Sequence, residues 1–177
     1  MTLPEISAAA RAPAEPPLMA KALRPLEGLA KVTTALAILC VLIFTLGQVA
    51  DRYILKGSFN AYDQIARIGL IWMTFLGAAL ALRERANIVV DLIDGYLSPK
   101  VVRIKALILD ALSFALMILL LGYAFRLLEV GAYQTVMGTP FTYREVYLAL
   151  VLGSILFIVF LAARIVTDVI SIVRPEQ

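Results

Sequence analysis

The sequence contains no histidine and only one cysteine, Cys40. Without histidine the chain has no bis-histidine haem ligation, histidine-based metal site, histidine proton relay or Ser-His triad. A single thiol also excludes a disulfide within the chain and a cysteine ligand cluster. These classes of cofactor, metal and catalytic site are therefore excluded.

Charge is scarce as well. Only 16% of the residues are charged while 62% are hydrophobic, and the mean hydropathy is +0.90. Because apolar residues make up only about half of a soluble domain, this composition indicates an all-α integral membrane protein. The 16 lysines and arginines lie at the ends of apolar runs and not on one face, so they indicate membrane topology and no nucleic-acid partner.

Four apolar runs are long enough to cross a bilayer core of about 30 Å, at 1.5 Å per helical residue. They cover residues 32–50, 65–82, 106–125 and 146–166 within a single membrane domain, residues 25–174. The first helix is predicted to open at Pro25. Residues 1–24 are rich in alanine and proline and predict a disordered cytoplasmic tail. A cleaved signal peptide is less favoured, because this region is too long and acidic and the following run is of spanning length.

The connections carry their own signals. Residues 51–64 and 126–141 are predicted loops. Between the second and third spans, polar residues recur at helical spacing among apolar ones, which predicts a short amphipathic helix in the membrane interface. Its acidic face is expected to pair with Arg83, Arg85 or the next basic cluster, or to face water. The polar residues are Asn87, Asp91, Asp94 and Ser98.

Two helix starts are marked by capping sequences. Ser98 followed by Pro99 predicts the beginning of the third helix. Thr142 and Glu145 form a capping box that predicts the beginning of the fourth.

Basic residues predict the orientation. With four spans, one side of the membrane holds Arg11, Lys21, Arg24, Lys31, Arg83, Arg85, Lys100, Arg103, Lys105, Arg164 and Arg174. The other side holds only Arg52, Lys56, Arg67, Arg126 and Arg144. Because the cytoplasmic side carries the excess of positive charge, both termini are predicted to be cytoplasmic.

Asp110 is the one acidic residue well inside a predicted span, and no neighbour one turn away on its own helix carries positive charge. Arg164 lies at the same depth on another span, so we predict an interhelical ion pair. The alternatives are a protonated Asp110 or an Asp110 that faces a polar groove on another subunit.

The spans lack what a transport pathway needs. No proline interrupts them, and their interiors offer only a few threonines and serines and Gln48. Secondary transporters hold substrate at the midplane with polar side chains or broken helices. The chain is therefore predicted to be a membrane subunit that packs against another protein.

The second span and its exit are the most specific stretch. Trp72, Phe75, Leu76, Gly77, Ala78, Ala79, Ala81 and Arg83, followed by Asn-Ile-Val-Val-Asp at 87–91, closely resemble the small membrane subunit of tripartite ATP-independent periplasmic (TRAP) transporters, the DctQ-like family. Two positions depart from the pattern. The family usually has histidine where Asn87 stands, and acidic residues before the second span where this chain has Tyr62, Asp63 and Gln64.

The resemblance implies a subunit of a complex in the bacterial inner membrane. Its partners would be a large DctM-like membrane subunit, which moves substrate with sodium, and a periplasmic substrate-binding protein that docks transiently. The small subunit would brace the large one during uptake of an organic acid, a carboxylate. It would carry no catalytic residue, no cofactor and no metal, and it is not expected to be an enzyme. The alternatives are a membrane anchor of a respiratory oxidoreductase, a generic four-helix scaffold and, third, a small multidrug exporter.

The stretch from residue 67 to residue 91 divides into two parts. Its span is predicted to pack against the large subunit or the other helices, through Trp72, Phe75, Gly77, Ala78, Ala79 and Arg83. Trp72 lies deeper than an interfacial tryptophan, and a role as core or lipid-facing filler is favoured over a partner contact. The exit, with Asn87, Asp91 and Asp94, is predicted to lie along the membrane and to be positioned by electrostatic contacts rather than by apolar packing.

Overall fold

The computed structural model describes residues 17–55, 61–84 and 99–173, and within them four long helices dominate. These are α2 (Pro17–Ala50), α3 (Ala61–Arg83), α4 (Pro99–Gly131) and α5 (Tyr143–Val173); a π-helical turn, η1 (Asp51–Leu55), extends α2. Each of the four is long and apolar enough to span a membrane. The prediction of an all-helical protein with four candidate membrane spans is confirmed. The predicted interfacial helix falls outside the described residues.

Two helix starts agree with the capping signals. Helix α4 begins at Pro99 and α5 directly after Thr142. The Glu145 carboxylate accepts hydrogen bonds from both the backbone N–H and the hydroxyl of Thr142, at 2.8 and 2.6 Å. This contact satisfies a backbone donor at the start of the helix, as a capping box should.

Other boundaries differ from the prediction. Helix α2 begins at Pro17 and continues through Pro25, so residues 17–24 belong to a helix and not to a disordered tail. The segment PLMAKALR consists mostly of good helix formers, and proline is well tolerated in a first turn. The predicted loops are also shorter, because η1 continues α2 to Leu55 and α4 continues to Gly131. Neither extension contains a proline or an internal glycine that would end the helix earlier.

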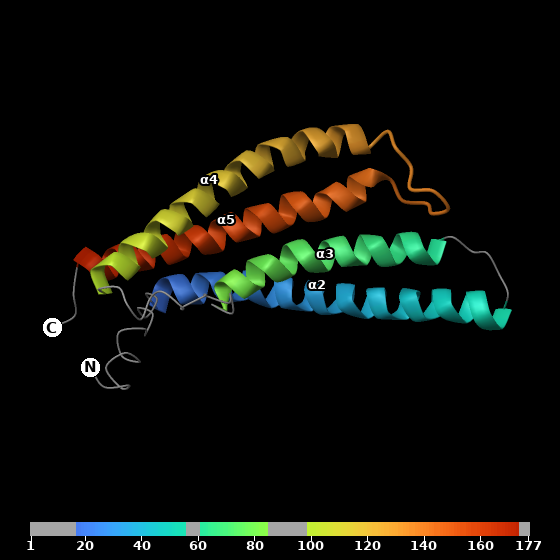
Figure 1. Ribbon diagram of the computed structural model, residues 1–177, viewed down its shortest axis with the longest axis horizontal. Coiled ribbons are helices and arrows are strands. Elements are labelled where there is room, and N and C mark those ends of the chain that lie inside the picture. The colour runs from blue at the N-terminus through green and yellow to red at the C-terminus, as the bar shows by residue number, and fades with distance from the viewer. Residues whose placement is uncertain (1–16, 56–60, 85–98, 174–177) are drawn as a thin grey trace.

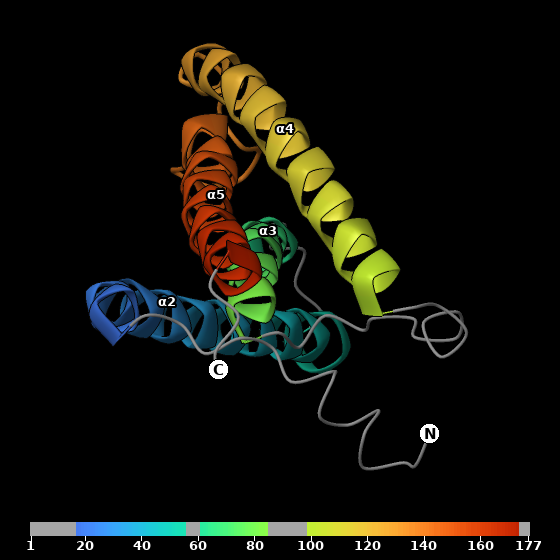
Figure 2. The ribbon, with the colours of Figure 1, turned by 90° about the vertical axis from the view of Figure 1, so that its left-hand side faces the viewer.

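The helices run alternately up and down. The amino-terminal ends of α2 and α4 lie at the same end of the molecule as the carboxyl-terminal ends of α3 and α5, on the left of Figure 1. The principal packing partners are α2 with α3, α3 with α5, and α5 with α4. The helices therefore form an open row in the order α2–α3–α5–α4, and Figure 2 shows α2 and α4 at its two ends.

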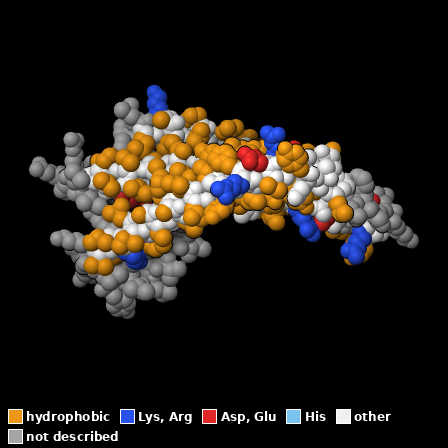
Figure 3. Space-filling view, turned by 90° about the horizontal axis from the view of Figure 1, so that it is seen from above, with side chains coloured by type: hydrophobic (Ala, Val, Ile, Leu, Met, Phe, Trp, Pro, Cys, Tyr) orange, Lys and Arg blue, Asp and Glu red, His pale blue; other side chains and the backbone are white. Residues whose placement is uncertain are grey.

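Burial follows the position in the row. About half of the most apolar window of α5 is buried (56%), against 11% for α2 and 6% for α4. One hydrophobic cluster joins α3 and α5 through Leu76, Ala79, Phe160 and Leu161. A smaller cluster joins α4 to α5 through Ala124, Leu150 and Val151. The outer faces of α2 and α4 are apolar and exposed, and Figure 3 shows hydrophobic side chains covering most of the face on which α4 lies.

Small residues set the closest helix approaches. A Cβ atom placed on Gly153 of α5 would lie 2.5 Å from the Cβ of Phe75 in α3 and 3.0 Å from its backbone carbon. On the other side of α3, a Cβ atom on Gly69 would lie 3.0 Å from Val41 in α2. Because backbones can approach this closely only where a side chain is missing, these glycines fix the spacing of the three helices.

We predict that Gly153→Ala separates α3 from α5 and destabilises the protein by roughly 1–3 kcal/mol, the usual cost of overpacking. The check is the thermal unfolding midpoint in detergent micelles. The matched control is Gly122→Ala in α4, because nothing lies within 4 Å of the added methyl group. Equal midpoints for the two variants would contradict the prediction.

Candidate functional site

The residues predicted to form the packing face of the second span separate into an inward and an outward set. Ala79 is fully buried, Phe75 and Gly77 are half-buried, and Ala78 is exposed. A Cβ atom placed on Gly77 would lie 3.9 Å from Thr34 of α2, which is ordinary van der Waals contact, so the packing here does not require a glycine. Most of the face is used inside the chain, while Ala78 points outward.

Trp72 joins α3 to the start of α5. Its indole N–H donates a hydrogen bond to the backbone carbonyl of Glu145 at 3.2 Å. A buried indole usually finds such an acceptor, and within a bilayer no water competes for it. Trp72 therefore has a specific contact within the chain, which sequence reasoning did not identify because its partner lies 73 residues away.

Arg83 connects three helices at the carboxyl-terminal end of α3. Its Nε donates to Glu27 Oε2 in α2 at 3.3 Å, and its guanidinium carbon lies 5.9 Å from the ring centroid of Phe160 in α5. Lys31 Nζ lies 2.8 Å from carboxylate oxygens of both Glu27 and Glu84, which closes the network between α2 and α3. Arg83 is mostly buried in this network. Asn87, Asp91 and Asp94, the predicted interfacial polar face, lie outside the described residues.

Asp110 of α4 and Arg164 of α5 lie together. Arg164 Nε is 3.1 Å from Asp110 Oδ2, and the Asp110 side chain is only 10% exposed. Neither atom meets the geometry of a hydrogen bond in this contact, so the attraction is mainly Coulombic. Asp168, one turn further along α5, lies 4.0 Å from the same Nε. The pair joins α4, which has few buried residues, to the most buried helix.

Three described threonine hydroxyls in the spans are used by their own helix, whereas the buried Thr34 Oγ1 has no hydrogen-bond partner among the described residues. Thr33, Thr74 and Thr167 each donate to the carbonyl four residues earlier, at 2.7 to 2.9 Å. Ser154 is buried and its Oγ has no hydrogen-bond partner among the described residues. Within those residues no group of three or more acidic, cysteine or histidine side chains could hold a metal ion.

Two hollows lie on the described surface. One, of about 640 Å³, lies where α4 meets the α4–α5 loop and is lined partly by Glu129, Tyr133 and Arg144. The other, of about 300 Å³, lies between α2 and α3 and has an almost entirely apolar lining. The larger hollow therefore lies at the loop end of the helices, and the smaller one has no charged residue in its lining.

The comparisons with known proteins agree with this architecture. The family model of the DctQ component of tripartite ATP-independent periplasmic transporters matches residues 24–170, which include all four candidate spans almost entirely. The chain belongs to the DctQ family. It is a multi-pass membrane protein, the small permease subunit of a bacterial TRAP transporter, and not an enzyme.

A named relative supports the same assignment. The chain is 27% identical over 153 residues to a Haemophilus influenzae protein whose name places it among TRAP transporter small permease proteins. The match covers 82% of this chain and 94% of the relative. Since TRAP systems are tripartite, this DctQ subunit belongs with a large DctM membrane component and a periplasmic binding protein.

We predict that Arg164→Gln destabilises this DctQ subunit by about 3 kcal/mol, because it removes a cation that lies 3.1 Å from a buried carboxylate. Adding Asp110→Asn should recover most of that loss, so the two changes should be strongly non-additive in a double-mutant cycle. Neutralisation is preferred to charge reversal, since an acid at position 164 would lie one turn from Asp168. Unfolding midpoints of the two single variants and the double variant provide the measurement.

The matched control is the exposed pair of Asp63 and Arg67, whose Nε–Oδ2 distance is a similar 3.0 Å. Because both side chains are exposed and lie within two turns of the amino-terminal end of α3, Arg67→Gln should cost no more than about 1 kcal/mol. Additive effects at Asp110 and Arg164 would show that the close contact contributes nothing.

Proposed function

We propose that this DctQ subunit braces the large membrane subunit of its TRAP transporter and takes no direct part in substrate binding. The single observation that carries the proposal is the open row of helices, in which the outer faces of α2 and α4 form long exposed apolar surfaces. A rigid row widens the surface against which a moving transport domain can slide. We further propose that the substrate is an organic acid with a carboxylate and that uptake is coupled to sodium.

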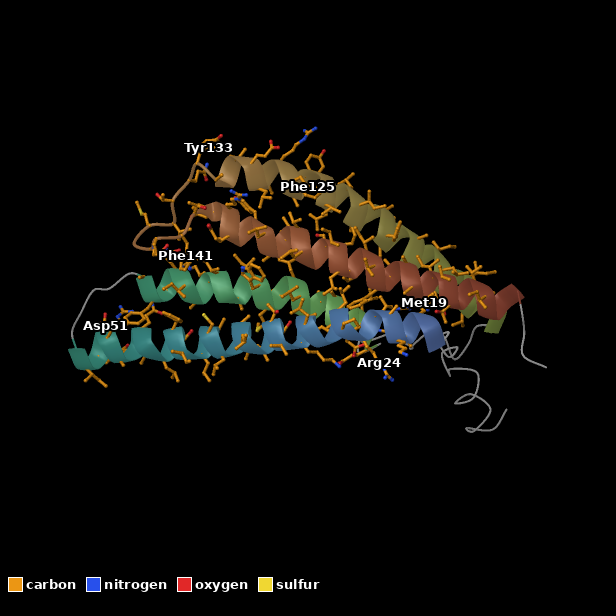
Figure 4. All side chains as sticks on the ribbon, turned by 180° about the vertical axis from the view of Figure 1, so that it is seen from behind. Met19, Arg24, Asp51, Phe125, Tyr133 and Phe141 are labelled. Carbon is orange, nitrogen blue, oxygen red and sulfur yellow. The ribbon has the colours of Figure 1, made fainter. Side chains whose placement is uncertain are left out.

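We propose that both termini lie in the cytoplasm of a bacterial cell and that the subunit resides in the inner membrane. The excess of lysine and arginine at the ends of the chain and between the second and third spans supports this orientation. The α4–α5 loop would then face the periplasm, where the binding protein arrives. Figure 4 shows Tyr133 projecting from this loop, and the residue is 91% exposed.

We also propose that the large subunit contacts the outward stripe of α3. Leu70, Thr74 and Ala78 are exposed and follow each other at four-residue spacing, although α3 lies inside the row. The Thr74 hydroxyl is bonded to the Leu70 carbonyl at 2.7 Å, so the stripe presents no unsatisfied polar group. Small residues such as Ala78 permit close approach of a second helix within a membrane.

We predict that Ala78→Phe lowers the amount of large subunit recovered with this chain by at least about tenfold, equivalent to 1.4 kcal/mol of association. The two proteins would be co-expressed with the binding protein, purified through a tag on this chain and assayed in parallel for uptake of carboxylates. The variant's own unfolding midpoint should stay at the wild-type value, because residue 78 is exposed.

The matched control is Ala111→Phe, which places the same side chain on an exposed site of α4. Normal recovery with Ala78→Phe would show that the stripe on α3 faces lipid. Failure of the wild-type chain to co-purify with any large membrane subunit would contradict the bracing role itself.

A further inference from the structure

The two halves of α2 meet α3 in different ways. In the carboxyl-terminal half the helices come close together, since a Cβ atom placed on Gly69 of α3 would lie 3.0 Å from the Val41 side chain. One placed on Gly47 of α2 would lie 3.1 Å from the ring of Tyr62. Nearer the amino-terminal end of α2, a Cβ atom on Gly77 would still lie 3.9 Å from its nearest neighbour. Figure 2 shows this end of α2 standing away from α3, so the helices cross near Gly69 and diverge from there.

Apolar contacts hold the amino-terminal half of α2 only weakly. Among the described residues of α2, Ala30 and Ala37 alone are buried. Leu23 is partly buried against the central cluster, whereas Leu29 is 67% exposed. An alanine makes far fewer packing contacts than a leucine, and packing is what holds helices together in a bilayer. A hollow of about 300 Å³ also lies between α2 and α3, which reduces the contact further.

Long charged side chains bridge the space between the diverging helices. Arg83 Nε, at the carboxyl-terminal end of α3, lies 3.3 Å from Glu27 Oε2, and the two side chains are only 12% and 22% exposed. Lys31 Nζ lies 2.8 Å from carboxylate oxygens of both Glu27 and Glu84. Glu27 lies about 14 residues, and therefore about 21 Å, from Val41 along α2. These contacts hold α2 at a point far from its crossing with α3.

Both charges of the main contact keep a partner when α2 moves away from α3. Glu27 keeps Lys31, which lies one turn further along the same helix at 2.8 Å. Arg83 keeps the ring of Phe160 in α5, whose centroid lies 5.9 Å from the guanidinium carbon. Opening this contact therefore costs less than opening an isolated buried ion pair would.

We propose that the amino-terminal half of α2 is a hinged arm. Its hinge lies at the crossing of Val41 with Gly69, and its latch is the contact of Glu27 with Arg83. While the latch is closed, the row of four helices keeps one shape. When the contact opens, the arm bends away from α3 and the carboxyl-terminal half of α2 stays in place. The arm is a property of this chain and does not depend on the partner that the row braces.

The test measures two distances in the full-length chain, which is reconstituted in lipid nanodiscs and carries pairs of spin labels on introduced cysteines. The native thiol is removed by Cys40→Ser. One pair of labels, at the exposed positions of Leu29 and Ala78, reports the separation of the arm from α3. The other pair, at the exposed positions of Leu42 and Leu70, reports the crossing. Pulsed electron–electron double resonance gives the distance distribution for each pair.

Arg83→Gln and Glu27→Gln each remove one charge of the latch. Leu29 lies about 18 Å from Val41 along α2, so a bend of about 15° should lengthen its label distance to Ala78 by about 5 Å. The distance at the crossing should stay unchanged. Because the two substitutions lie on different helices, either variant is sufficient to test the latch if the other does not fold.

The matched control is Arg67→Gln, which removes an arginine from a contact within α3 and should leave both distances at their wild-type values. A wild-type distance between Leu29 and Ala78 in the latch variants would show that the buried alanines hold the arm, and the proposal would be wrong. Lengthening of both distances would mean that α2 leaves α3 as a whole, which would also overturn the hinge.

Discussion

The close approach of α3 and α5 is the constraint on which the rest of the structure depends. A Cβ atom on Gly153 of α5 would lie 2.5 Å from the Cβ of Phe75 in α3 and 3.0 Å from its backbone carbon, so there is no room for a methyl group between the two helices. The hydrophobic cluster of Leu76, Ala79 and Leu161 forms because the helices meet at this distance. In a bilayer, where lipid tails are as apolar as leucine, such packing must supply the association energy that the hydrophobic effect supplies in water.

Polar contacts then tie the outer helices to this central pair. Arg83 joins the end of α3 to α2 through Glu27, and Arg164 joins α5 to α4 through Asp110. Both contacts involve partly buried charges, so removing one partner would leave the other charge uncompensated and would lower the free energy of unfolding. An open row whose outer helices are joined to the central pair by these ion pairs suits the proposed scaffold role, since it presents long apolar surfaces.

The sequence predicted the helices better than their ends. Pro99 and the box of Thr142 and Glu145 marked true starts, because capping chemistry is local and can be read from a few residues. Pro25 suggested a start that the structure places at Pro17, since either proline could occupy a first helical position and the residues between them are mostly good helix formers. The contact of Trp72 with Glu145 could not be predicted, because its acceptor is a backbone carbonyl that has no sequence signature.

The sequence by itself determined the solvent, the number of spans and the family, since hydropathy, helix length and the motif from Trp72 to Asp91 are properties of consecutive residues. Only the tertiary structure decided which faces meet. Gly77 and Gly153 are both small residues inside apolar runs, yet one has room beside it and the other has none. That difference depends on where two helices come closest to each other, which is set by the packing of residues far apart in the sequence.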